Sequence, residues 1–266
     1  MRPSTLLQLF LLAVLLLASG TTAEKEIDCG IRMSCQNEER TKSKTQQNTN
    51  TNKSNMALAA RLSGHRRGAA TAPHTLEVFL DYVCPFSAKI YKKLNDEVLP
   101  FLDKEHPGKV SFIFRQQVQP WHPISTEVNE AGLAIERLAP NKFFEFSTLL
   151  FEHQKDYFDE NVADKSRNDT YRSLSALAEK VGVDRQQFLD LLIIPTGPNV
   201  EVKNGGNKLQ NDLKLVIRAG RQNGIHVSPT VLWDGIADTS VSSGWDLAQW
   251  KEWLDGRFSA TGRPSL

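Results

Sequence analysis

The residue best suited to do chemistry is Cys84, which lies in the sequence Cys84-Pro85-Phe86-Ser87 where a strand-like run gives way to a helix-like one. Pro85 suits the first position of a helix, because its missing N–H needs no partner there. A thiol at that helix N-terminus faces unpaired N–H groups and the positive end of the helix dipole. Both favour the thiolate, which is the nucleophilic form of cysteine. We therefore expect Cys84 to be the only active-site thiol, with Ser87 beside it.

A second segment of chemical interest lies far along the chain, at Val227-Ser228-Pro229-Thr230. Peptide bonds that precede proline adopt the cis form far more readily than others. A cis bond before Pro229 would bring this backbone close to the sulfur, without a donor from the proline nitrogen. The expected substrate-binding residues are Pro85, Phe86, Ser228, Pro229 and Thr230.

Each of these residues also has a plain structural interpretation. Cys84 can be a buried structural cysteine, since free cysteine is among the most buried residue types. Ser87 can be a small polar residue of a first helical turn, and Pro229 an ordinary trans proline. His122, in the sequence Pro-Trp-His-Pro at 120–123, is a candidate base near Cys84. For His122 we favour a capping or packing role.

The elements that must position these residues follow from hydrophobic patterning. Residues 75–83 read as a buried strand, a helix follows from Pro85, and alternation at 110–115 predicts a second strand. The helix is long enough for a crossover, so the two strands are expected to be parallel. Its buried stripe is expected at Phe86, Ile90, Leu94, Val98 and Leu102.

A long helical stretch follows, and the chain then returns to strand. Asp184 is placed to cap one of the helices, with Gln187 able to reach back. A strand is expected at 229–233, a tight turn at Asp234-Gly235, and a short return strand from Ile236. The helical faces are expected at Val128, Ala131, Ile135 and Leu138; at Phe143, Phe146 and Leu150; at Tyr171, Leu174, Leu177, Ala178 and Val181; at Leu209, Leu213, Val216, Ile217 and Gly220; and at Leu247, Trp250, Trp253 and Leu254, closed by Gly256.

The two motifs, in this order of elements, resemble the DsbA-like family of thioredoxin-fold proteins. The turn at 84–87 is similar to that family's active-site turn, and the segment at 227–230 to its cis-proline loop. A helical insertion between the second strand and that loop marks the family. The resemblance implies an α/β thioredoxin fold with an inserted helical subdomain at about 120–205, in a domain covering 73–256. It also implies thiol–disulfide exchange with protein or small-molecule disulfides.

The sequence departs from the family pattern at Ser87, where dithiol members carry a second cysteine. That cysteine resolves the mixed disulfide. With serine there, the expected chemistry is monothiol, through a Cys84 mixed disulfide that an outside thiol such as glutathione releases. The Ser87 hydroxyl is also a candidate hydrogen-bond donor to the Cys84 thiolate. Two alternatives remain open: a glutathione-dependent transferase or isomerase of thioredoxin fold, and a redox-inactive module that binds peptides.

The first 72 residues are expected to lie outside this domain. Residues 1–23 have the layout of a signal peptide, with an apolar run and a small-residue cleavage site. An uncleaved anchor and a misread start are the alternatives, and translation from Met56 would make the protein cytoplasmic. Residues 24–72 are too polar to fold and are expected to be a disordered linker, and 257–266 a C-terminal tail.

Secretion, or retention in the secretory pathway, would place the cysteines in an oxidising compartment. Cys29 and Cys35 are then a candidate disulfide, which leaves Cys84 unpaired. Asn52 and Asn168 are candidate glycosylation sites. No metal site, no tightly bound cofactor and no membrane span after signal removal are expected. The formal net charge of +1 favours no binding to nucleic acid, and the oligomeric state stays open.

Overall fold

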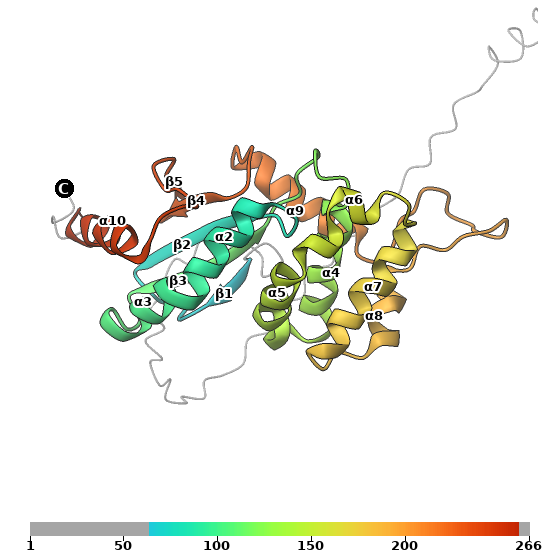
Figure 1. Ribbon diagram of the computed structural model, residues 1–266, viewed down its shortest axis with the longest axis horizontal. Helices are drawn as coiled ribbons and strands as arrows, with labels where there is room; N and C mark the ends of the chain where they lie inside the picture. Colours follow the sequence, from blue (N-terminus) through green and yellow to red (C-terminus); the bar gives the residue numbers. More distant parts are fainter. Residues whose placement is uncertain (1–63, 261–266) are drawn as a thin grey trace, which may run out of the picture. The chain divides into compact units, whose positions relative to one another are not determined.

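The computed structural model describes residues 64–260, which fall within the second of the two compact units of the chain, 54–266. Their centre is a sheet of five strands in the order β1-β3-β2-β4-β5 (Figure 1). The central pair, β2 and β3, is parallel, as expected, and the other pairs are antiparallel. The strands are β1 (His65–Arg67), β2 (His74–Leu80), β3 (Val110–Gln116), β4 (Thr230–Trp233) and β5 (Ile236–Ala237).

A helical crossover joins β2 to β3 and lies along the sheet (Figure 1). It consists of α2 (Pro85–Lys93), a π-helical segment (Leu94–Val98) and α3 (Leu99–Glu105). Pro100 explains the wide turn, because it has no N–H for the preceding turn and its ring crowds the carbonyl four residues back. The expected buried stripe is correct except at Phe86, whose side chain is exposed.

The two faces of β2 differ in what they bury. Leu76, Val78 and Leu80 belong to the main core, because alternate residues of a strand point to the same face. Phe79, on the opposite face, packs in a small second cluster with Ile225 and Leu232. The main core is therefore the layer shared by the sheet, the crossover and the helical block.

The helical block follows β3, as the patterning predicts, and gathers beside one end of the sheet in Figure 1. Asp184 caps α8 by accepting a hydrogen bond from the N–H of Gln187 at 2.8 Å. Gly182, with φ +84°, ends the preceding helix as expected. The helices of the block are α4 (Ser125–Leu138), α5 (Phe143–Glu152), α6 (Asp159–Val162), α7 (Arg167–Lys180) and α8 (Arg185–Leu192), with 3₁₀ turns at Pro140–Lys142 and Gln154–Tyr157.

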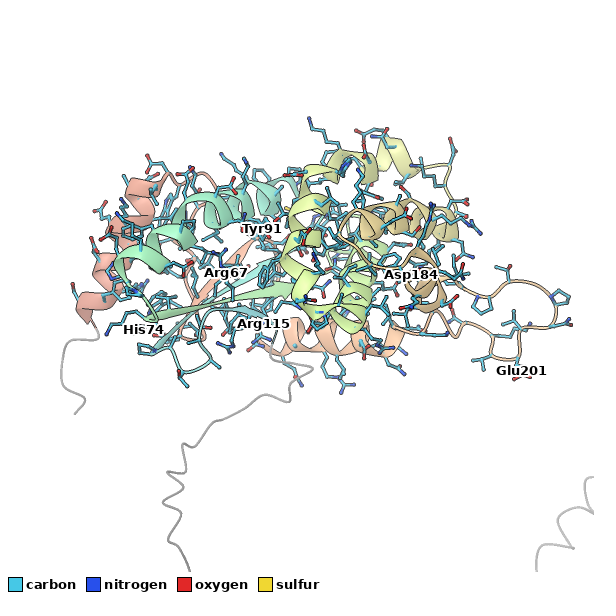
Figure 2. All side chains as sticks on the ribbon, turned by 90° about the horizontal axis from the view of Figure 1, so that it is seen from below. Arg67, His74, Tyr91, Arg115, Asp184 and Glu201 are labelled. Carbon is cyan, nitrogen blue, oxygen red and sulfur yellow. The ribbon has the colours of Figure 1, made fainter. Side chains whose placement is uncertain are left out.

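The chain leaves the helical block through a long loop, which extends away from the helices and carries Glu201 (Figure 2). Helix α9 (Gln210–Gln222) then leads back to the sheet, and α10 (Leu247–Ala260) follows the hairpin of β4 and β5. The hairpin turn matches the sequence prediction, since both Asp234 (φ 50°) and Gly235 (φ 81°) are left-handed.

The ends of the domain differ from the sequence prediction. Strand β1 lies inside the expected linker 24–72 and pairs with β3, so the fold begins before residue 73. At the other end, α10 continues through Gly256 to Ala260, so residues 257–260 are not a tail. None of the helices in the described range is both long and apolar enough to span a bilayer.

Candidate functional site

Cys84 lies at the junction between β2 and α2, as the N-cap residue of that helix. Its backbone is extended, with φ −83° and ψ 119°, and Pro85 takes the first helical position. The Cys84 N–H donates to Asp81 O at 3.1 Å, and Ala88 N–H donates to Cys84 O at 3.1 Å. These two bonds close the turn after the strand and begin the helix, so they fix where the sulfur can lie.

The sulfur is covered by the loop that carries Ser228. Cys84 is only 5% exposed, and its Sγ donates a hydrogen bond to Ser228 O at 3.3 Å. The peptide bond between Ser228 and Pro229 is cis. The structure therefore places the Cys84 sulfur against the cis-proline loop, as the two sequence motifs predicted.

Ser87 is one helical turn beyond Cys84 and is fully buried. Its Oγ accepts a hydrogen bond from Asp81 N–H at 3.2 Å. The hydroxyl therefore secures the turn before the cysteine, and the expected hydrogen bond from Ser87 to the Cys84 sulfur is not formed.

Asp81 is the buried centre of a polar cluster beneath this turn. One carboxylate oxygen accepts bonds from Val83 N–H (3.2 Å) and Ser125 Oγ (3.0 Å), and the other meets His122 Nδ1 at 2.7 Å. Burial raises the pKa of the Asp81 carboxyl, and the hydrogen bonds from His122, Val83 and Ser125 offset part of that rise. His122 thus pairs with a carboxylate next to the cysteine turn, beyond the capping or packing role expected for it.

Two glutamine side chains tie the turn and the Ser228 loop to the rest of the molecule. Gln154 Nε2 donates to Tyr82 O at 2.7 Å and to Cys84 O at 3.0 Å. Gln119, with its amide oriented to match its neighbours, donates to His226 O and accepts from Ser228 N–H and Oγ. Sequence reasoning missed both glutamines and Asp81, because no local pattern marks a polar residue that will be buried.

The remaining expected substrate-binding residues differ in their exposure and contacts. Phe86 is 63% exposed, two positions after Cys84, whereas Thr230 begins β4 and donates its hydroxyl to Val227 O at 2.7 Å. A cavity of about 180 Å³ opens beside the turn that carries Cys84, which is not itself a lining residue. Val83 and Pro85, the two neighbours of Cys84 in the chain, line it together with His122 and Tyr157.

The other candidate sites lie away from this cluster or outside the described residues. Asn168 is in α7, where its amide donates to Ile194 O (3.0 Å) and accepts from Ile194 N–H (2.9 Å). Thr170, the third residue of that sequon, is buried. The side chain of Asn168 therefore holds the main chain of Ile194 in place where the long loop begins. Asn52, Cys29 and Cys35 lie outside the described part of the chain.

Comparison with known proteins is consistent with this geometry. A family model with the description "Thioredoxin" matches residues 60–255. No curated protein matches the chain.

Among solved structures, a protein-disulfide isomerase candidate from Pseudomonas syringae is 25% identical, with a TM-score of 0.57 over 73% of this chain and 99% of that chain. MdbA, a thiol-disulfide oxidoreductase from Actinomyces oris, is 19% identical, with a TM-score of 0.52 over 76% and 86%. DsbA from Chlamydia trachomatis is 15% identical, with a TM-score of 0.51 over 78% and 96%. The chain therefore belongs to the thioredoxin family and has the DsbA-like form of the fold, with a helical block inserted after β3.

Proposed function

We propose that the protein is a thiol–disulfide oxidoreductase that works through a single thiol, Cys84. The observation that carries the proposal is the position of the Cys84 sulfur, at the N-terminus of α2 and against Ser228 of the proline loop. Membership of the thioredoxin family and the thiol–disulfide chemistry named for similar structures support it. Unpaired N–H groups at the start of α2 stabilise negative charge on sulfur as it attacks.

The reaction is a pair of exchanges. Cys84 loses its proton, and its thiolate attacks a substrate disulfide R–S–S–R′ to give Cys84–S–S–R, while R′–S⁻ leaves and takes up a proton as R′–SH. Because position 87 is serine, no neighbouring thiol of this turn resolves the intermediate. An outside thiol R″–SH, with glutathione as the candidate, then attacks the mixed disulfide to give R–S–S–R″ and restores Cys84–SH.

Exposed apolar side chains in the first turn of α2 and on two loops suggest that the substrate is a polypeptide. Phe86 follows the cysteine, Trp121 (57% exposed) precedes His122, and Val227 (52% exposed) precedes Ser228. Large exposed apolar side chains around a reactive group are typical of a surface that binds another protein. An extended peptide would contact these side chains while its disulfide meets the sulfur.

The low exposure of Cys84 favours a second candidate, a redox-inactive module that binds peptides on the same surface. A cysteine residue that is 5% exposed, with its sulfur hydrogen-bonded to a carbonyl oxygen, gives a substrate disulfide little access in this conformation. The two candidates predict the same binding surface, and they differ only in whether Cys84 reacts.

The deciding experiment uses a peptide with an internal disulfide and apolar flanking residues, with reduced glutathione as the second substrate. The wild type is expected to reduce the peptide with turnover, and without glutathione to accumulate a peptide adduct on Cys84. The Cys84→Ser variant is expected to do neither. Equal peptide binding by both proteins without any adduct would overturn the proposal and support the redox-inactive module.

The proposed compartment is the secretory pathway or the cell exterior, where disulfide substrates persist. The segment that would direct the chain there, 1–23, lies outside the described residues. Sequencing the N-terminus of the native protein tests this proposal, because cleavage near residue 23 supports it and a start at Met56 contradicts it.

A further inference from the structure

The ring of His122 is held in one orientation by a buried carboxylate. Asp81 Oδ2 lies 2.7 Å from His122 Nδ1. Asp81 cannot rotate away without losing the bonds that its other oxygen accepts from Val83 N–H and Ser125 Oγ. A carboxylate at Nδ1 fixes the neutral ring in the tautomer that carries its proton there, so the lone pair is on Nε2. Nε2 has no hydrogen-bond partner within residues 64–260.

His122 also lines the cavity beside the cysteine turn, although Cys84 itself is not among the residues that line it. Its side chain is 23% exposed and lines the 180 Å³ cavity that Val83 and Pro85, on either side of Cys84, line as well. The cysteine turn is linked directly to the residue that orients His122, because the Cys84 N–H donates a hydrogen bond to the main-chain oxygen of Asp81. A substrate sulfur that departs from Cys84 into this cavity would meet the imidazole.

Thiol–disulfide exchange removes a proton from the attacking thiol and returns one to the departing sulfur, and a nearby acid or base can speed both transfers, but the immediate neighbours of Cys84 do not supply one. The partner of the sulfur is Ser228 O, a carbonyl that cannot take the proton. The Ser87 hydroxyl is buried and bonded to Asp81 N–H. Burial raises the pKa of Tyr157, another residue of the cavity, to about 12. Asp159 and Glu160 lie at the exposed rim. An imidazole, by contrast, accepts and donates protons near neutral pH.

We propose that His122 is the general acid and base of disulfide exchange at Cys84, and that Asp81 positions it. This inference rests on the proposed function. In the first exchange, Nε2 takes the proton of the Cys84 thiol as the Sγ–S bond forms and the substrate S–S bond breaks. The same proton then goes to the departing sulfur, which leaves as a thiol. In the second exchange, Nε2 takes the proton of the attacking outside thiol and gives it to the Cys84 sulfur as the mixed disulfide breaks. Each exchange thus consumes one thiol and one disulfide and yields one of each.

The test compares two reagents whose departing sulfurs differ in their need for a proton. The 5-thio-2-nitrobenzoate anion leaves 5,5′-dithiobis(2-nitrobenzoate) as a stable thiolate, whereas hydroxyethyl disulfide releases an alkyl thiolate that must be protonated. Proton transfer by a positioned side chain contributes typically 10²–10⁴-fold. In His122→Gln, the rate constant with hydroxyethyl disulfide is therefore expected to fall at least about tenfold further than that with the nitrobenzoate reagent.

Further variants separate proton transfer from a structural effect. Free imidazole is expected to restore part of the hydroxyethyl disulfide rate to His122→Ala and to leave the wild-type rate unchanged. Asp81→Asn should change the ratio of the two rates in the same direction, and if it fails to fold, His122→Gln carries the test. His226→Gln is the matched control, because His226 lies on the neighbouring loop and its side chain is exposed.

The outcomes are distinguishable. Equal loss of both rates in His122→Gln, with no rescue by imidazole, would overturn the role of His122 and leave the proposed function standing. No reaction of wild-type Cys84 with either reagent would overturn the proposed function and this inference with it.

Discussion

The sulfur of Cys84 lies 3.3 Å from the main-chain oxygen of Ser228, although 144 positions separate the two residues in the sequence. The contact joins the N-terminus of the crossover helix to the loop that enters β4. The antiparallel pairing of β2 with β4 explains it, because Phe79 lies opposite Thr230 and brings the end of one strand to the start of the other. The pairing of the two strands therefore brings the two motifs together, since one motif follows the end of β2 and the other precedes the start of β4.

The first prediction concerns the missing second thiol. Ser87→Cys should restore a dithiol, because position 87 is one helical turn from Cys84. The variant is expected to form an internal disulfide under oxidising conditions and to release glutathione adducts without an outside thiol. Counting alkylated cysteines by mass before and after reduction measures it. A variant that keeps a stable glutathione adduct on Cys84 would contradict the prediction.

Ser87→Ala is the matched control for that variant. It removes the acceptor of the Asp81 N–H hydrogen bond inside the protein. An unsatisfied buried N–H costs about 1–3 kcal/mol, so the free energy of unfolding should fall by that amount. The monothiol reaction of Cys84 should persist, because Ser87 makes no hydrogen bond to the sulfur.

A second prediction concerns the apolar surface around the thiol. Phe86→Ala should raise the KM for an apolar peptide disulfide several-fold, because the exposed ring is expected to be buried by the substrate. The rate with a small disulfide and the thermal midpoint should change little, since the ring supports no core in the free protein. Val202→Ala, an exposed apolar residue on the long loop, serves as the control. Equal KM values for Phe86→Ala and the wild type would contradict the proposed docking surface.

A third prediction concerns pH and the C-terminal helix. Asp238 accepts hydrogen bonds from Ser240 N–H (2.9 Å) and Trp253 Nε1 (2.9 Å) and pairs with Arg257. Burial alone would raise its pKa, but these partners bring the pKa of Asp238 down to about 2. The stabilisation is therefore present above the unfolded pKa of about 3.9 and is lost as the pH falls toward 2.

Asp238→Asn should accordingly lower the free energy of unfolding at neutral pH by about 1–2 kcal/mol. The difference from the wild type should shrink as the pH is lowered from about 4 to about 3. Urea titrations at several pH values measure it. A difference that stays constant over this range would show that the carboxylate charge is not what stabilises the helix.

A fourth prediction follows from the corrected C-terminal boundary. Truncation after Gly256 removes Arg257 and Phe258, whose ring lies 5.8 Å from Trp233 and 4.5 Å from His106 between centroids. Loss of this packing should lower the free energy of unfolding by about 2 kcal/mol or more. The control ends at Ala260 and keeps α10 whole. Identical denaturant midpoints for the two truncations would show that residues 257–260 do not stabilise the fold, as expected of a tail.

The sequence predicted most of the fold, because patterns of apolar residues and turn signals are local. The parallel strand pair, the helical block, the Asp184 cap and the hairpin at Asp234-Gly235 were all expected, and the structure contains them. Strand β1 was missed because its residues, His65–Arg67, are polar and are ordered by pairing with β3. Phe86 was wrongly placed in the buried stripe, because helical periodicity does not say where a helix passes beyond the core.

The candidate site was predicted only in part. The cysteine turn and the proline loop carry local motifs, so their meeting at Cys84 and Ser228 could be expected from the fold they imply. The Asp81–His122 pair could not, since it joins residues 41 positions apart through a buried carboxylate that looks like any other acid in the sequence. The partner of Ser87 was unpredictable for the same reason, because a hydroxyl bonds to whichever group the final packing leaves closest.

Whether Cys84 is a reactive thiol can be read from the intact mass of the protein after brief exposure to oxidised glutathione at mildly acidic pH. An ordinary thiol, with a pKa of about 8.5, barely reacts under these conditions. We expect rapid addition of one glutathione at Cys84, full reversal by excess reduced glutathione, and no addition at this site in Cys84→Ser. A wild-type protein whose Cys84 stays unmodified would contradict this expectation and identify the sulfur as an inert, buried part of the core.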